Sequence, residues 1–128
     1  MARTCFVLMP FSPTFNGIWQ TVLRPTVQAS GDICFRADDI FAPGLIMNDI
    51  LRSIREADYI IADLTEQNPN VYYELGLAHA LTKPVILITQ NTANLPFDLR
   101  HQRVIVYSDT AAGAAQLRTV LTQYLSNV

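Results

Sequence analysis

The sequence contains only one lysine, Lys83, and its eight arginines are spread along the chain instead of being clustered. Charged residues make up 16% of the 128 residues, and the formal net charge is −2. A protein that binds a nucleic-acid polymer normally carries a basic stripe that neutralises the phosphates. The charge distribution therefore argues against a nucleic-acid partner.

Long apolar segments and cysteine clusters are also lacking. No apolar run approaches the roughly 20 residues of a membrane-spanning helix, and the first residues lead into a strand-like run instead of a signal peptide. The two cysteines, Cys5 and Cys34, lie in apolar runs without a metal-binding pattern. We expect a cytoplasmic protein with two reduced core thiols, no metal or other cofactor, and no membrane partner.

Half of the residues are apolar, which is enough for one domain of this length to bury a core. Short apolar runs alternate with segments of helical periodicity. The expected strands are 5–9, 33–36, 59–62, 84–88 and 104–107, and the expected helices are 17–29, a segment after Gly44, 69–81 and 111–125. Pro25 should kink the first helix or end it early.

Apolar strands that alternate with helices are typical of a parallel sheet covered on both faces. Right-handed crossovers leave few topologies for five such strands. We predict one α/β domain, 1–128, with a flavodoxin-like three-layer sandwich and a mostly parallel sheet in the order 2-1-3-4-5. Ligands of such sheets bind beyond the carboxyl ends of the strands, where strands 1 and 3 diverge.

Polar side chains follow the expected strands at this edge. The residues that the four strands deliver there are Met9, Pro10, Phe11 and Ser12, then Asp38 and Asp39, then Asp63 and Thr65, and finally Thr89 and Gln90. The third expected helix starts at the same edge, with Asn68 as its cap and Pro69 in its first position. Its free amides favour an anion or a polar group.

Glu74 stands out by its position on this helix. At about 100° per residue, with Val71 at zero, Glu74 falls at roughly 300°. This angle lies inside the apolar arc of the helix, which also holds Leu77, Leu81, Ala78 and Leu75. A carboxylate aimed at an apolar face is costly unless it is partnered or used. We expect Asp63 and Glu74 to face each other, so that one pKa is raised. An equally weighted alternative is structural: Asp63 caps the next turn and Glu74 pairs with an arginine.

The segment Ala62–Gly76 reads Ala-Asp-Leu-Thr-Glu-Gln-Asn-Pro-Asn-Val-Tyr-Tyr-Glu-Leu-Gly, and Lys83–Ile86 follows it after a short interval. Together with Val7–Phe11, Arg36–Asp39 and Pro96–Arg100, this segment resembles a bacterial subgroup of the nucleoside 2-deoxyribosyltransferase-like superfamily, which is related to TIR domains. The resemblance covers nearly the whole chain and implies the fold of that superfamily.

In that superfamily the glutamate before Leu-Gly acts on the anomeric carbon of a ribose or deoxyribose, and it corresponds to Glu74. The acid after the third strand corresponds to Asp63, which would orient the sugar or help to protonate the leaving base. Asn70 would hydrogen-bond the sugar, and Phe11 and Tyr73 would sandwich the base. The other residues expected to bind substrate are Met9, Pro10, Ser12, Asp38, Asp39, Asn68, Gln90, Phe97, Asp98 and Arg100, with Met9–Ser12 and Arg100 at a phosphate.

The leading prediction is an N-glycosidase or deoxyribosyltransferase-like enzyme, with Glu74 as the nucleophile that attacks a nucleoside or nucleotide. One alternative is a non-catalytic module that binds a nucleotide, and another is a TIR-like NAD hydrolase. The expected partner is a small-molecule nucleoside or nucleotide. Relatives of this kind often assemble, which leaves a homo-oligomer open.

Overall fold

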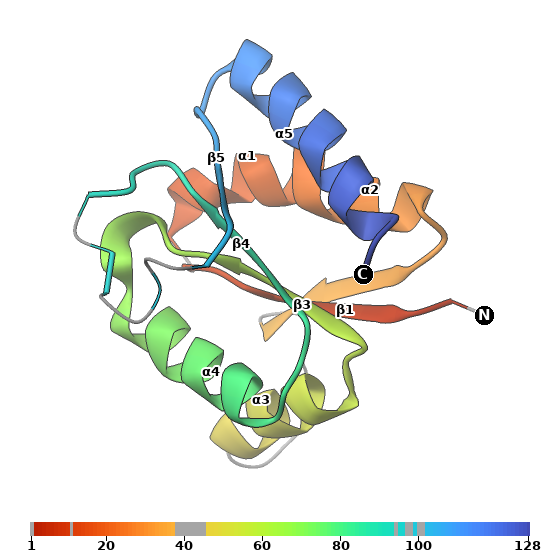
Figure 1. Cartoon of the computed structure of the whole chain (residues 1–128), viewed down its shortest axis with the longest axis vertical. Coiled ribbons are helices and arrows are strands. Elements are labelled where there is room, and N and C mark those ends of the chain that lie inside the picture. The colour runs from red at the N-terminus through yellow and green to blue at the C-terminus, as the bar shows by residue number, and fades with distance from the viewer. Residues whose placement is uncertain (1, 11, 38–45, 94, 97–98, 100–101) are drawn as a thin grey trace.

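The computed structural model describes residues 2–10, 12–37, 46–93, 95–96, 99 and 102–128. Its sheet has the order β2-β1-β3-β4-β5, and every neighbouring pair is parallel (Figure 1). The strands are β1 (Thr4–Leu8), β2 (Ile33–Arg36), β3 (Tyr59–Asp63), β4 (Val85–Thr89) and β5 (Val104–Val106). The predicted flavodoxin-like α/β fold and strand order are confirmed, and the sheet is wholly parallel where mostly parallel was expected.

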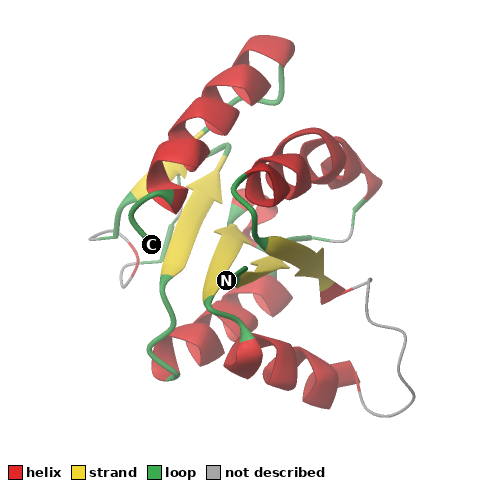
Figure 2. Cartoon of the chain, turned by 90° about the vertical axis from the view of Figure 1, so that its right-hand side faces the viewer, coloured by secondary structure: helices red, strands yellow, loops and turns green. Residues whose placement is uncertain are grey.

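Helices cover both faces of the sheet (Figure 2). They are α1 (Asn16–Ile18), α2 (Arg24–Ala29), α3 (Ile46–Glu56), α4 (Pro69–Ala80) and α5 (Ala111–Leu125). One core lies between the sheet and α1, α2 and α5, and a second lies between the sheet and α3 and α4. The strands are apolar because both of their faces are buried.

Side chains of β3 alternate between these two cores. Tyr59 and Ile61 pack into the core beside α5, whereas Ile60 and Ala62 pack into the core beside α4. Because successive strand residues point to opposite faces, Asp63 at the end of β3 belongs to the α5 side. This parity decides which residues Asp63 can reach.

Pro25 does not end the first helical segment. Helical residues continue from Asn16 to Ala29, and a π-helical turn, Trp19–Leu23, lies immediately before Arg24. Proline lacks an N–H group, and a wider turn accommodates its ring and the missing hydrogen bond. Burial of Trp19 and Leu23 keeps the segment packed on the sheet.

Both cysteines are buried and free, as predicted, and Cys5 lies opposite Cys34 in the pairing of β1 with β2. Among the described helices, none has the length and apolar character of a membrane span. The described ranges also hold no group of three or more His, Cys, Asp or Glu side chains suited to a metal ion.

Arg3 ties together the two ends of the described chain. Its Nη2 donates to Asp32 Oδ2 at 2.9 Å, and its Nη1 donates to the main-chain oxygen of Val128 at 2.6 Å. Tyr59 Oη donates to the same oxygen of Asp32 at 2.8 Å. The start of β1, the residue before β2 and the end of α5 are thereby held at the amino edge of the sheet (Figures 1 and 2).

Candidate functional site

Glu74 lies in the second turn of α4, the helix that leaves the carboxyl end of β3. Val71 and Leu75 of this helix are buried against the sheet. Tyr72 and His79 lie on a flank that faces the β4–β5 connection, where they line a hollow with other residues. Glu74 is two residues from Tyr72 and so points roughly 200° away from it around the helix.

Glu74 therefore lies on the flank of α4 that is turned toward α3. The two helices pack side by side on the same face of the sheet (Figure 1). In open parallel sheets ligands bind beyond the carboxyl ends of the strands at the point where the strand order reverses, which here lies between β1 and β3. The partial burial of Glu74 agrees with the apolar arc in which its helix angle places it.

The carboxylate of Glu74 is half-buried and has neither a hydrogen-bond donor nor an arginine partner among the residues that the structure describes. Burial raises the pKa of Glu74 to about 7. A neutral-pH solution therefore contains both protonation states in comparable amounts. Such a group can act as a nucleophile or base when ionised and as an acid when protonated.

Asp63 is fully buried, and both of its carboxylate oxygens accept hydrogen bonds. The amide of Thr65 donates to Oδ1 at 2.9 Å, and Tyr107 Oη donates to Oδ2 at 2.5 Å. Burial raises the pKa of Asp63, although the hydrogen bonds from Thr65 and Tyr107 oppose this shift. Asp63 lies at the carboxyl edge of the sheet, as predicted, but its side chain is not exposed to solvent.

The expected pairing of Asp63 with Glu74 is wrong. Asp63 points to the α5 side and meets Tyr107, whereas α4 covers the other face of the sheet. Burial alone raises the pKa of Glu74, without a contribution from a neighbouring carboxylate. The helix angle identified Glu74 correctly as a partly buried carboxylate, but the parity of β3 directs Asp63 to the other face of the sheet.

Asn68 caps α4, as predicted. Its Oδ1 accepts hydrogen bonds from the amides of Asn70 at 2.8 Å and Val71 at 3.3 Å, and Pro69 occupies the first helical position. Asn70 is exposed one turn before Glu74, on the same flank of the helix. Asn68 thus has a structural role, whereas the side chain of Asn70 is exposed.

The remaining predicted binding residues are dispersed. Met9 and Pro10 are buried, Ser12 is partly exposed beside Thr14, and Tyr73 on α4 is 61% exposed. Gln90 is hydrogen-bonded to Tyr107. Six of the predicted residues lie outside the described residues: Phe11, Asp38, Asp39, Phe97, Asp98 and Arg100.

Sequence reasoning missed two buried polar residues at the carboxyl edge. Tyr107, only 5% exposed, bonds Asp63 from the end of β5. Arg36, 7% exposed at the end of β2, donates to Asn16 Oδ1 at 3.1 Å and lies 5.0 Å from the ring centre of Trp19. The alternation of side chains along β2 could have indicated the burial of Arg36, because Arg36 lies on the same face of the strand as the buried Cys34.

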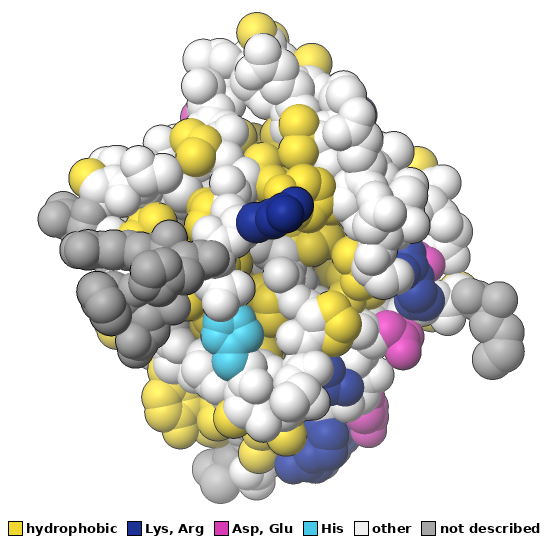
Figure 3. All heavy atoms as spheres, in the orientation of Figure 1, with side chains coloured by type: hydrophobic (Ala, Val, Ile, Leu, Met, Phe, Trp, Pro, Cys, Tyr) yellow, Lys and Arg dark blue, Asp and Glu magenta, His cyan; other side chains and the backbone are white. Residues whose placement is uncertain are grey.

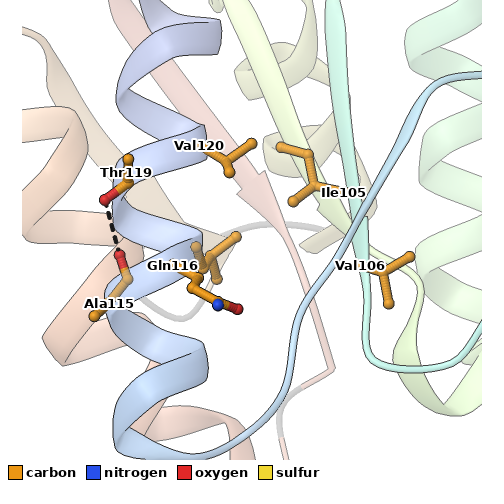
Figure 4. A pocket seen from close by; sticks show the side chains of 7 residues that line it. Ile105, Val106, Ala115, Gln116, Thr119 and Val120 are labelled. Carbon is orange, nitrogen blue, oxygen red and sulfur yellow. Dashed lines mark hydrogen bonds between the residues drawn. The ribbon is translucent and has the colours of Figure 1, made fainter.

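A hollow of 480 Å³ lies between β5 and α5, away from Glu74 (Figure 4). Hydrophobic side chains gather along this side of α5 on the surface (Figure 3). The hollow is lined by Ile105, Val106, Ala115, Gln116, Leu117, Thr119 and Val120. None of these side chains ionises in the range of acid–base chemistry, so we place the candidate site at Glu74 instead.

No family model matches the sequence, and no curated protein matches it. The structure is similar to the CMP N-glycosidase BcmB of Clostridium botulinum, with a TM-score of 0.74, 19% identity, and coverage of 95% of this chain and 99% of that one. It is also similar to the TIR domain of the Toll-related receptor TRR-2 of Hydra magnipapillata, with a TM-score of 0.74, 16% identity, and coverage of 96% and 94%.

A third similar structure is the 2-deoxyribosyltransferase of Leishmania mexicana, with a TM-score of 0.65, 21% identity, and coverage of 91% of this chain and 97% of that one. At identities this low, the structural similarity establishes the fold and nothing further. The similar structures include both the transferase and the TIR domain that the sequence resemblance named, so this resemblance is confirmed at the level of the fold.

Proposed function

We propose that the chain is an enzyme that cleaves the N-glycosidic bond of a nucleoside or nucleotide, with Glu74 as its nucleophile. The observation that carries this proposal is the half-buried Glu74 carboxylate, which has no partner among the described residues and a pKa of about 7. A carboxylate without a partner is not needed for stability, because its burial opposes folding. Its place on the helix that leaves the carboxyl end of β3 favours a chemical role.

The chemistry follows from the geometry of a carboxylate beside a sugar. An ionised oxygen of Glu74 forms a bond to C1′, and the C1′–N bond breaks, with its electron pair leaving on the base, which takes up a proton. Water then attacks C1′ and releases Glu74, or a second base attacks and gives a transferred nucleoside. Asn70, one turn earlier on the same flank, would hydrogen-bond a sugar hydroxyl.

The similar structures support this class of substrate. One is titled a CMP N-glycosidase and another a 2-deoxyribosyltransferase, and both share the fold along more than nine-tenths of this chain. The proposed partner is accordingly a small-molecule nucleoside or nucleotide.

A chromatographic assay tests the proposal. Purified protein is incubated with ribonucleosides, deoxynucleosides and their monophosphates, and free base is measured for the wild type, Glu74→Gln and Glu56→Gln. Glu56 is an exposed carboxylate at the end of α3 and serves as the matched control. We expect base release from the wild type and Glu56→Gln, and a loss of roughly 10³-fold or more in Glu74→Gln. Turnover by Glu74→Gln at the wild-type rate would exclude the mechanism.

A second candidate function is NAD hydrolysis, favoured by the similarity to a TIR domain at a TM-score of 0.74. NAD belongs in the same panel, and nicotinamide release with intact nucleosides would favour this function. Saturable binding without any released base would instead favour a module that only binds a nucleotide.

A further inference from the structure

The turn between β3 and α4 has an unusual backbone. Glu66 and Gln67 have φ values of 70° and 51°, although neither is glycine. The left-handed region is unfavourable for residues with a Cβ atom and persists only where surrounding contacts fix it. Within the turn, the amide of Gln67 donates to the carbonyl of Leu64 at 3.1 Å. The start of the turn is tied to β4, because the amide of the buried Leu64 donates to the carbonyl of Ile88 at 2.9 Å.

A closed ring of four hydrogen bonds adds side-chain contacts that hold the next residue of the turn, Thr65, against β4 and β5. Asp63 Oδ1 accepts from the Thr65 amide at 2.9 Å, and Thr65 Oγ1 accepts from the Gln90 amide at 2.9 Å. Gln90 Nε2 donates to Tyr107 Oη at 3.2 Å, and Tyr107 Oη donates back to Asp63 Oδ2 at 2.5 Å. The ring joins the ends of three neighbouring strands, and two of its members, Asp63 and Tyr107, are buried.

We propose that this ring positions Glu74, so that Asp63 acts by fixing the β3–α4 turn and not by touching the substrate. The proposal rests on the function proposed for Glu74. Asp63 has no exposed surface, and both of its oxygens are occupied within the ring. The turn leads directly into the Asn68 cap of α4, so a shift at the turn displaces Glu74 in the second helical turn.

Substitutions at Asp63 separate a positioning role from a catalytic one. Asparagine keeps an oxygen for the Thr65 amide and an amide group that can donate to Tyr107 Oη, whereas alanine removes both contacts. We expect Asp63→Asn to keep kcat within roughly tenfold of the wild type and Asp63→Ala to lose roughly 100-fold, with smaller changes in KM. If Asp63→Asn is as inactive as Asp63→Ala, the carboxylate itself acts on the substrate and the proposal is wrong.

Tyr107→Phe opens the ring by removing a single hydroxyl. The matched control is Tyr124→Phe on α5, because the hydroxyl of Tyr124 makes no hydrogen bond among the described residues. Amide hydrogen exchange at Thr65 and Gln90 should become roughly tenfold faster in Tyr107→Phe and Asp63→Ala, and stay unchanged in Tyr124→Phe and Asp63→Asn. The pKa of Glu74, followed by carboxyl NMR, should move toward its ordinary value when the ring opens.

These two measurements do not depend on turnover, so they distinguish failure of the ring from failure of the proposed function. If the wild type releases no base, the function proposed for Glu74 fails. If exchange at Thr65 and Gln90 and the pKa of Glu74 are unaffected by Asp63→Ala and Tyr107→Phe, the positioning ring is excluded.

Discussion

Arg3 Nη2 donates to Asp32 Oδ2 over 2.9 Å and joins the start of β1 to the residue that precedes β2. Tyr59 Oη donates to the same carboxylate oxygen. Burial alone would raise the pKa of Asp32, but the hydrogen bonds from Tyr59 and Arg3 outweigh it and hold the pKa below its ordinary value. The ionised form of Asp32 therefore stabilises the folded chain.

This stabilisation is fully present above the pKa of Asp32 in the unfolded chain, about 3.9, and is lost as the pH falls through the lower folded pKa. We expect Asp32→Asn to lower the free energy of unfolding by about 1.5 kcal/mol at pH 7. Urea unfolding at a series of pH values measures the difference. A difference that does not shrink below pH 4 would show that Asp32 acts through packing instead of charge.

Glu74 changes the pH dependence of stability in the opposite direction from Asp32. Because its folded pKa of about 7 lies above the ordinary value of 4.5, the folded state binds a proton more tightly than the unfolded state does. The free energy of unfolding should therefore fall as the pH rises from 4.5 to beyond 7. We expect Glu74→Gln to match the wild type near pH 4 and to be more stable at pH 8, as measured by denaturant midpoints. Equal stability at both pH values would contradict the raised pKa.

Tyr72 carries a buried hydroxyl that has no hydrogen-bond partner among the described residues. Removing an unsatisfied buried hydroxyl is neutral or stabilising, and Tyr72→Phe should raise the free energy of unfolding by about 0–1 kcal/mol. Tyr59→Phe is the contrasting variant, because it removes a donor to Asp32 and should lower the free energy of unfolding by about 1 kcal/mol. Thermal unfolding of the two variants at pH 7 tests the difference in sign.

Two helical glycines should respond oppositely to alanine. A Cβ atom on Gly113 would lie 2.1 Å from the carbonyl oxygen of Ser108, whereas one on Gly76 would meet nothing within 4 Å. We expect Gly113→Ala to destabilise the chain by about 1–3 kcal/mol through the clash. Gly76→Ala should stabilise it by about 0.5–1 kcal/mol, because alanine favours the helix. Destabilisation by Gly76→Ala would contradict the prediction, because it would show that a Cβ atom at this position meets a neighbouring atom.

The fold was predictable because its determinants are local and periodic. Strands such as Tyr59–Asp63 are short apolar runs with both faces buried, and Asn68–Pro69 marks the start of α4 by simple capping chemistry. The partial burial of Glu74 was predictable in the same way, since its angle on the helix depends only on neighbouring residues. Of the two outcomes expected at Pro25, the early end of the helix is wrong, because a π-helical turn before Pro25 avoids the conflict with α-helical hydrogen bonds.

The partners of Asp63 were less predictable because they are distant in sequence. Tyr107 is 44 residues away, and its contact depends on the register of β3, β4 and β5 together with the face on which Asp63 lies. The parity of β3 alone would have placed Asp63 with Tyr59 and Ile61, away from α4. Contacts that depend on register and on the path of a loop need the three-dimensional structure.

The bond between Arg3 and the main chain of Val128 brings the two ends of the described chain together at the amino edge of the sheet. Glu74 belongs to the opposite, carboxyl edge. A peptide or protein fused at either end therefore emerges on the side away from the candidate site. The same proximity makes the chain suited to circular permutation, in which a short linker joins the old ends and new ends open in a surface connection.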